Sequence, residues 1–495
     1  MKYTNPVLCA DYSDPDVIRI DKGFLMVASS FNRIPAVPVL YSENLVEWKL
    51  VNYVSDRLPF DRYDKVCHGC GAWAPAVRFH GGKYYCLIPF PDEGIYVSET
   101  DDPFGKWSPL RPLMTGAGFE DPCPIWADGK CYIVFAFAKS RAGFNSTLAI
   151  IEADENLTCV SGSYTPIYDG YNHNPKIEGP KIFRRGKYYY ILAAAGGVKS
   201  GWQTMLRSEN IFGPYESKII LAQGDTDING PHQGSLVELD GDKWAFIHFQ
   251  DRGAFGRVIH VQPAIWRDEW LLCGKVTDEK LFGEPVEGGE YPVDVKTGFK
   301  IEPSDDFDKK ELSPVWQNPA NRRKEWYELK NGLKLNCAYY GGNAVSDLPQ
   351  LFLEKIYYEN FNVKTKCKLN LVNDGDETGF IVYGRKYMYA CAVRRNGRNY
   401  LEIRQGEIGK ETDETLCQSQ PYDEKYITFK LSARYEDRHK LACKFTLGES
   451  AFTKKFYAAA GVWTGASLGI YARSSAESGG FAEFRYFKVK EVKDR

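Results

Sequence analysis

Five stretches of the chain begin with a residue that can do chemistry and continue into a short strand-forming run. Each run is followed by a glycine-containing turn and an aromatic strand-forming segment. Three of the five leading residues are carboxylic acids, and the others are a tryptophan and a histidine. The leading residues are Asp14 of DPDVIRI, Trp73 of WAPAVRF, Asp121 of DPCPIW, Glu178 of EGPKIF and His232 of HQGSLVE.

Three acids around one pocket would suit the hydrolysis of a glycosidic bond. One protonated carboxyl gives its proton to the leaving oxygen, and an ionised one activates water or attacks directly. A third acid raises the pKa of its neighbours by like-charge repulsion, so the proton donor keeps its proton at neutral pH. A metal site built from Asp14, Asp121, Glu178 and His232 is the alternative chemistry. The plain structural reading of a single Asp-Pro is a turn.

The spacing of these stretches indicates a repeated fold unit. The leading residues lie 59, 48, 57 and 54 positions apart, and each interval has room for four strands. Four-stranded units repeated around an axis form a β-propeller, here with five blades. Because the inner strands of all blades begin at one end of the channel, we expect the five leading residues to converge there.

Composition and patterning extend the all-β interpretation to the whole chain. The 495 residues suffice for two or three domains, and 14% of them are aromatic. Residues 1–293 carry the propeller pattern, 294–304 look like a linker, and 305–495 alternate apolar and polar residues as in TGFIVYGRKYMYACAVRR. This alternation predicts an antiparallel β-sandwich in the second domain.

The net charge and the cysteine content indicate which partners and which cellular compartment to expect. The formal net charge of −2 gives no field that favours nucleic acid or an anionic membrane, and no run of residues is long enough to span a bilayer. The first residues show no apolar leader, and the thirteen cysteines follow no framework spacing, so we expect a reduced, cytoplasmic protein. Cys67 and Cys70 form a lone CxxC, which is weak support for zinc. The sequence leaves a homo-oligomer open.

The ordered motifs resemble glycoside hydrolase family 43, the five-bladed propellers that include β-xylosidases and α-L-arabinofuranosidases. The resemblance covers about the first 290 residues, and the later residues resemble the concanavalin-like jelly-roll sandwich that follows the propeller in many of these β-xylosidases. The matching segments include NPVLCADYSDPDVIRI, GAWAPAVRFHGGKYY, FEDPCPIW, IEGPKIFRRGKYYYILAAAGGV and GRVIHVQPAIW.

The resemblance implies an inverting hydrolase with a role for each matched residue. Asp14 would be the general base, Glu178 the general acid, and Asp121 the residue that modulates and orients the acid. Four further residues would bind substrate: Phe31 and Trp73 as apolar walls, Arg257 as a sugar contact, and His232 in the channel. No cofactor is required, although a calcium or sodium ion near His232 is compatible with the resemblance.

One motif departs from the family pattern and leaves the sugar undecided. Many family β-xylosidases have AEGGT where this chain has AAAGGV, ending at Val198, so a carboxylate and a hydroxyl are missing. We expect an exo-acting β-D-xylosidase that takes terminal xylose from xylo- or arabinoxylo-oligosaccharides, with a sandwich loop closing one side of the pocket or the sandwich acting as a stabilising module. An α-L-arabinofuranosidase, a bifunctional enzyme and a non-catalytic sugar-binding propeller are the alternatives.

Overall fold

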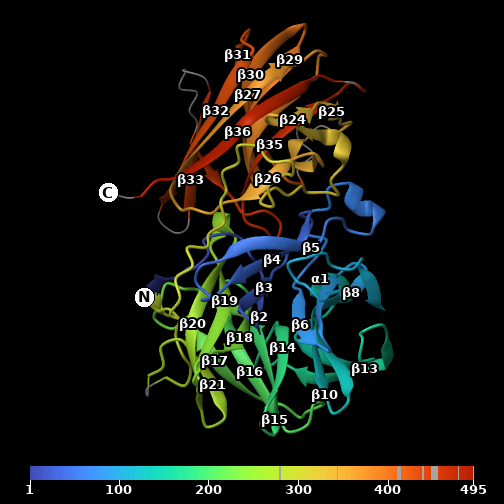
Figure 1. The fold of residues 1–495 in the computed structure, drawn as a ribbon, viewed down its shortest axis with the longest axis vertical. Coiled ribbons are helices and arrows are strands. Elements are labelled where there is room, and N and C mark those ends of the chain that lie inside the picture. Colours follow the sequence, from blue (N-terminus) through green and yellow to red (C-terminus); the bar gives the residue numbers. More distant parts are fainter. Residues whose placement is uncertain are drawn as a thin grey trace.

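Two β-rich units lie one above the other in the computed structural model (Figure 1). The structure describes residues 1–277, 280–342, 344–409, 414–436, 440–447, 455–477 and 479–493. The N-terminal unit is the lower one in Figure 1, and the C-terminal unit stands on top of it. The predicted propeller and sandwich are both confirmed.

The lower unit, described without a gap over residues 16–273, is a propeller of five four-stranded antiparallel sheets. Consecutive strands build each blade from the channel outward. The first blade holds β2 (Asp16–Ile20), β3 (Gly23–Val27), β4 (Ala36–Ser42) and β5 (Lys49–Ser55); the second β6 (Ala76–His80), β7 (Lys83–Phe90), β8 (Gly94–Thr100) and β9 (Arg111–Thr115); the third β10 (Phe119–Ala127), β11 (Lys130–Phe137), β12 (Thr147–Ala153) and β13 (Val160–Asp169); the fourth β14 (Glu178–Arg185), β15 (Tyr188–Ala195), β16 (Trp202–Ser208) and β17 (Glu216–Ala222); the fifth β18 (His232–Glu238), β19 (Trp244–Asp251), β20 (Arg257–Arg267) and β21 (Trp270–Cys273).

Tight turns between the first two strands of the blades follow from the glycines seen in the sequence. In the third blade Ala127 pairs with Lys130, so Asp128 and Gly129 form a two-residue hairpin loop. Both loop residues have positive φ, at 52° and 75°. This backbone matches the twist of the flanking strands, and aspartate followed by glycine is the pair that adopts it most readily.

Helical structure in the described residues is limited to short segments. One α-helical turn, α1 (Lys139–Ala142), lies between β11 and β12 at the channel mouth, and 3-10 turns occur at Asp61–Asp64, Gly253–Phe255, Lys324–Trp326 and Val345–Asp347. The N-terminal strand β1 (Lys2–Thr4) leaves the blades and pairs with β22 (Gly288–Glu290), which follows the last blade. This pairing ties the two ends of the propeller together.

A fully buried carboxylate, Asp16, joins four blades inside the channel. It accepts hydrogen bonds from the Val77 backbone N–H at 2.7 Å, from Arg78 Nη1 at 2.7 Å and from Ser235 Oγ at 2.9 Å. The Lys181 ammonium lies 3.5 Å away. Burial by itself would raise the pKa of Asp16, but these partners hold the pKa below its ordinary value. Asp16 is therefore an ionised, paired group that fastens the blades to one another.

The upper unit is a sandwich of two seven-stranded sheets, counted over the described residues. Alternation is clear in β27, where every second side chain is buried, so each sheet packs one face on the other. One sheet holds β23 (Tyr327–Leu329), β24 (Leu333–Asn336), β36 (Phe481–Glu491), β27 (Phe361–Asn370), β32 (Tyr426–Glu436), β33 (Lys440–Leu447) and β34 (Lys455–Ala458); the other holds β25 (Ala338–Tyr339), β35 (Ser467–Ser474), β28 (Glu377–Tyr383), β29 (Lys386–Arg395), β30 (Arg398–Glu407), β31 (Thr415–Pro421) and β26 (Phe352–Lys355), which pairs with β35.

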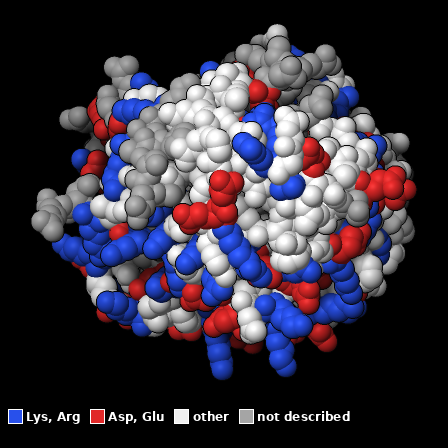
Figure 2. Space-filling model, turned by 90° about the horizontal axis from the view of Figure 1, so that it is seen from above, with Lys and Arg blue, Asp and Glu red and all other residues white. Residues whose placement is uncertain are grey.

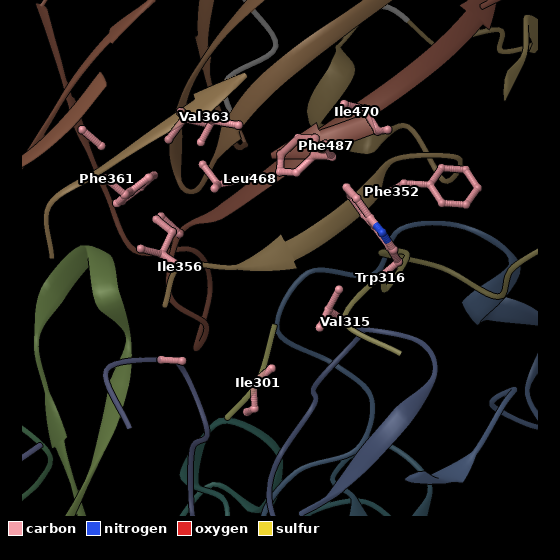
Figure 3. Packing of buried hydrophobic residues seen from close by; sticks show 14 of the residues in the cluster. Ile301, Val315, Trp316, Phe352, Ile356, Phe361, Val363, Leu468, Ile470 and Phe487 are labelled. Atoms are coloured by element: carbon pink, nitrogen blue, oxygen red, sulfur yellow. The ribbon is translucent and has the colours of Figure 1, made fainter. Parts of the chain in front are cut away.

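The two units share one hydrophobic core. Figure 3 shows Trp316, Val315 and Ile301 between the sandwich strands and the propeller ribbons, and Trp316 is fully buried. Polar bonds reinforce this contact, since the Asn318 and Ile34 backbones exchange hydrogen bonds of 2.7 and 2.9 Å. A joint core of this kind fixes the sandwich relative to the propeller.

The last blade ends at Cys273 and the first sandwich strand begins at Tyr327, so the predicted boundaries at 293 and 305 fall between them. Those exact boundaries stay a prediction. The end of the molecule seen from above carries mixed Lys, Arg, Asp and Glu, and neither sign dominates its coloured residues (Figure 2). Within the described part of the chain, no helix has the length and apolar character needed to cross a membrane.

Candidate active site

A cavity of about 380 Å³ opens at the channel mouth on the side that faces the sandwich. Its volume is typical of a small-ligand site. Carboxyls, aromatic rings and a few basic groups line it: Asp14, Phe31, Trp73, Ala74, Glu120, Asp121, Ala138, Lys139, Ser140, Asn145, Lys176, Glu178, Gly197, Val198, Gln233, Arg257 and Trp463. Six of the seven predicted site residues belong to this wall, and His232 does not.

The inner strands of the third, fourth and fifth blades begin with a bulge, which places the acids in two layers. In the third blade Glu120 pairs with Ala136 and Cys123 with Val134, so Asp121 is the extra residue. In the fourth blade Glu178 pairs with Ala194 and the bulge follows it. Glu178 therefore corresponds to Glu120, and not to Asp121.

The same offset corrects the predicted equivalence of the five leading residues. Asp14 and Asp121 both have φ of 56°, as expected for the bulged position, and Gly179 and Gln233 have φ of 65° and 37° there. Trp73, Glu178 and His232 belong to the other layer. All five still gather at the channel mouth, because the bulge turns the extra residue toward the same opening.

Asp14, the predicted base, is held by two donors. Arg257 Nη1 lies 3.1 and 3.3 Å from its two oxygens, and Ser29 Oγ donates to Oδ2 at 2.5 Å. Its exposed fraction is 4%. Burial raises the pKa of Asp14 above its ordinary value, while the Arg257 charge and the Ser29 hydrogen bond oppose that rise. The two donors favour the ionised form, which is the form that can take a proton from water.

Asp121 is equally buried but has weaker compensation. The Gly179 backbone N–H donates to its Oδ2 at 2.8 Å. Burial and the neighbouring charges of Glu178 and Asp14 raise the pKa of Asp121 to about 7. Asp121 is thus a carboxyl that changes its charge near neutral pH, and its hydrogen-bond donor, Gly179, is the residue that follows Glu178.

Glu178, the predicted acid, is the most accessible of the acids, with 30% of its side chain exposed. Its Oε1 lies 2.8 Å from His232 Nε2. The His232 ring is fully buried and stands behind Glu178, so the structure differs from the prediction that His232 contacts the sugar. In this geometry His232 positions Glu178 instead.

Glu120 is a fourth carboxyl that the sequence analysis missed. It lines the cavity, its exposed fraction is 8%, and burial together with the Asp121 charge raises its pKa well above the ordinary range. The sequence nevertheless contains a pattern that identifies Glu120. Aligning the blades on Pro15, Pro122 and Pro180, instead of on the first acid, puts Glu120 opposite Glu178.

The apolar walls come from two blades and from the sandwich. Phe31 and Trp73 meet edge to face with ring centres 6.2 Å apart, and Trp73 meets Trp463 in the same way at 6.1 Å. The loop that carries Cys67 and Cys70 supports Trp73, whose Nε1 donates to the Gly69 carbonyl at 3.2 Å. Arg257 lies 5.9 Å from both the Phe31 and Trp463 ring centres.

Trp463 reaches the cavity on a sandwich loop anchored to the propeller. Asp11 Oδ2 accepts from the Gly465 N–H, and Oδ1 accepts from the Arg257 N–H, both at 2.9 Å. The Ala466 N–H donates to the Ala254 carbonyl at 2.7 Å. The sandwich thus supplies part of the pocket wall, and Asp11 holds that loop and Arg257 together.

The residues around His232 were tested for the channel ion that the family resemblance implies. The buried His232 Nδ1 has no hydrogen-bond partner among the described protein groups. However, no three His, Cys, Asp or Glu side chains of the described chain gather closely enough to hold a metal. A calcium ion needs six to eight oxygen ligands. An ion near His232 would therefore take most of its ligands from water, and it stays a prediction.

A sugar-sized pocket with several carboxyls at the mouth of a five-bladed propeller defines a fold and site suited to glycoside hydrolysis. The sequence model of glycosyl hydrolases family 43 matches residues 3–271, and that of the β-xylosidase C-terminal concanavalin A-like domain matches residues 304–490. The chain belongs to glycosyl hydrolases family 43. The predicted family and fold are therefore confirmed.

Several proteins of the family are similar to this chain. A protein of Xylanibacter ruminicola, named as a candidate β-xylosidase, is 38% identical over 339 residues, which are 66% of this chain and 62% of that protein. The chain thus spans less than two thirds of that relative. A β-xylosidase of Formosa agariphila is 27% identical over 98% of this chain and 90% of its own length. A non-reducing-end α-L-arabinofuranosidase of Bacteroides ovatus is 25% identical over 99% and 94%.

A solved structure supports the arrangement of both units. The crystal structure of a xylan β-1,4-xylosidase from Bacillus halodurans has a TM-score of 0.83 and 22% identity over 99% of this chain and 100% of that one. At this identity the likeness concerns the fold.

Proposed function

We propose that this protein is an inverting, exo-acting β-D-xylosidase that removes terminal xylose from β-1,4-xylo-oligosaccharides. The observation that carries the proposal is the pair of differently held acids in one pocket. Asp14 is fixed by Arg257 and Ser29, and Glu178 is partly exposed beside His232. An ionised base and a protonated acid on opposite sides of a sugar are what inversion requires.

The proposed reaction uses only these side chains and water. Asp14 takes a proton from water as the water oxygen bonds to the anomeric carbon of the sugar. The bond from that carbon to the leaving oxygen breaks, and Glu178 gives its proton to the leaving oxygen. Asp14, Asp121 and Glu178 all line the cavity in which this exchange of protons is proposed.

The shape of the pocket supports action at chain ends. Trp463 from the sandwich and Trp73 from the second blade form a shared aromatic wall beside the acids, and the loop of Trp463 is anchored at Asp11. A pocket walled in this way holds a terminal sugar better than the middle of a polymer. Short oligosaccharides are therefore the proposed substrates, and their cleavage is proposed to occur in the cytoplasm.

An α-L-arabinofuranosidase is the second candidate, because Val198 lines the cavity where many family β-xylosidases carry polar groups. Terminal xylose and arabinofuranose present similar hydroxyl patterns, so one pocket can accept both. A similar Bacteroides ovatus protein bears the arabinofuranosidase name.

The test is hydrolysis of nitrophenyl β-D-xylopyranoside and nitrophenyl α-L-arabinofuranoside side by side, with the first product anomer read by proton NMR. The proposal expects the xyloside to be the better substrate and α-xylose to appear first. A preference for the arabinofuranoside would favour the second candidate, and first release of β-xylose would contradict inversion. Glu178→Gln tests the catalytic reading: a hydrolase loses most of its activity on xylobiose, whereas a sugar-binding propeller has none to lose.

A further inference from the structure

We propose that Glu120 binds a hydroxyl group of the terminal sugar and helps determine which sugar the pocket accepts. This inference rests on the proposed function, since it concerns the same pocket. It assigns a polar contact to a residue outside the predicted catalytic and binding set.

The position of Glu120 directs it to the sugar site. Its backbone pairs with Ala136 immediately before the bulge, as Glu178 pairs with Ala194 in the next blade. Both side chains line the cavity. Two glutamates at corresponding positions of adjacent blades therefore face the same bound molecule.

Glu120 also lacks a partner in the protein. More than nine tenths of the residue is buried, and no described protein group forms a hydrogen bond or ion pair with its carboxyl. The charge of Arg141 lowers the pKa of Glu120, but Arg141 is bound elsewhere. Its Nε donates to Asp92 Oδ1 at 3.2 Å, and its guanidinium lies 5.2 Å from the Trp73 ring centre. Because Glu120 lines the cavity, its carboxyl is open to a hydrogen bond from a ligand there, and such a bond in a mostly buried site is stronger than in water.

The chemistry of the surroundings indicates how Glu120 would bind. Burial and the charges of Asp121, Glu178 and Asp14 raise the pKa of Glu120 well above the ordinary range, so these surroundings favour the neutral carboxyl. A neutral carboxyl both donates and accepts one hydrogen bond, which matches a hydroxyl group. A site that hydrogen-bonds a hydroxyl strongly rejects an analogue without it, and this gives specificity.

The experiment compares Glu120→Gln and Glu120→Ala with the parent protein on the two nitrophenyl glycosides and on the three monodeoxy nitrophenyl xylosides. Glutamine keeps one donor and one acceptor, so it should stay within about threefold of the parent kcat/KM. Alanine should lower kcat/KM by about 10- to 100-fold, mainly through KM, and change the ratio of xyloside to arabinofuranoside. For one deoxy sugar the parent and the alanine variant should be equal, because the lost hydroxyl is the one that Glu120 binds.

Three kinetic results would overturn the proposal. One is an alanine variant with parental kinetics on every sugar. Another is equal additional loss on all deoxy sugars, which means that no single hydroxyl is involved. The third is a loss in kcat for xylobiose with none for the nitrophenyl xyloside, which would assign an acid role. Calorimetric binding of free xylose and arabinose separates this proposal from the proposed function: weaker binding by Glu120→Ala than by Glu120→Gln supports it even if the parent protein hydrolyses neither substrate, and equal binding contradicts it.

Discussion

The propeller channel holds buried carboxyls at two depths, and the protein treats them in opposite ways. Asp16, inside the ring, is paired with Arg78, Lys181 and Ser235, and its pKa lies below the ordinary value. Asp121, at the mouth, accepts one backbone hydrogen bond, and its pKa rises to about 7. The two residues belong to inner strands of the same fold and are both buried.

This difference separates a structural carboxylate from a functional one. Burial penalises the charge of both groups. Asp16 has more opposite charges and donors around it, whereas the like charges of Glu178 and Asp14 also act on Asp121. The full pairing of Asp16 stabilises the packing of the blades. The incomplete pairing of Asp121 lets it exchange a proton near neutral pH, and it lowers the stability of the folded protein when Asp121 is ionised. Sites that do acid–base chemistry commonly carry such a cost.

The largest expected effect concerns Asp14, the mouth carboxyl with the best donors. Asp14→Asn keeps the shape but removes the base, so kcat/KM for nitrophenyl xyloside should fall by about 1000-fold or more. Steady-state kinetics at several pH values check this. Activity within about tenfold of the parent protein would show that another group takes the proton from water.

The next largest effect is expected on stability, when the charge of Asp16 inside the ring of blades is removed. Asp16→Asn leaves Lys181 and Arg78 without their carboxylate, and we expect the free energy of unfolding to fall by about 3 kcal/mol. Ser235→Ala is the control that keeps every charge: it removes one donor to Asp16 and the acceptor of the Val17 N–H, and should cost about 1 to 2 kcal/mol. Urea unfolding measures both. Equal effects would mean that the charges of the ring contribute little.

Asp121→Asn should change the stability in the opposite direction and make the protein more stable. Because the folded-state pKa of Asp121 is raised to about 7, folding favours its protonated form, and the parent protein loses stability as the pH rises from about 4, the ordinary pKa of an aspartate, to about 7. The asparagine variant avoids this loss and should be more stable than the parent by on the order of 2 kcal/mol at about pH 8, with little gain near pH 4. Its activity should nevertheless fall, which kinetic assays on the same preparation check.

The smallest expected effect concerns the wall that the sandwich adds. Trp463→Ala should raise KM for the nitrophenyl xyloside about 5- to 10-fold and leave the melting temperature nearly unchanged, because Trp463 is 49% exposed. Tyr426→Ala, an exposed aromatic residue of the sandwich outside the cavity wall, is the control and should not change KM. An unchanged KM in the Trp463 variant would limit the sandwich to a stabilising role.

The repeat in the sequence was sufficient to predict the blades and the convergence of the acids. Each blade is a local unit of consecutive strands, so its pattern of strand, glycine turn and aromatic strand is preserved in the sequence. The three predicted catalytic acids were visible because each lies within two residues of the start of an inner strand. Their roles stay predictions.

Other features depended on geometry that the pattern does not record. A one-residue bulge separates Asp121 from the layer of Glu178, and this offset concealed Glu120. Trp463 enters the site only because a sandwich loop docks on Asp11, more than 450 positions earlier in the chain. His232 shares the spacing of the acids, but its ring lies behind Glu178 and not on the cavity wall.

The pH dependence of the melting temperature for Asp16→Asn and Asp121→Asn, measured beside the parent protein from about pH 4 to about pH 9, tests the contrast between the two depths most directly. Asp16→Asn should melt below the parent throughout the neutral range, with a deficit that shrinks as acid protonates the parent carboxylate. Asp121→Asn should melt above the parent with a margin that grows as the pH rises from about 4 to about 7 and then levels off. Two variants that both melt below the parent at about pH 8 would contradict the account, because both carboxyls would then be stabilising charges.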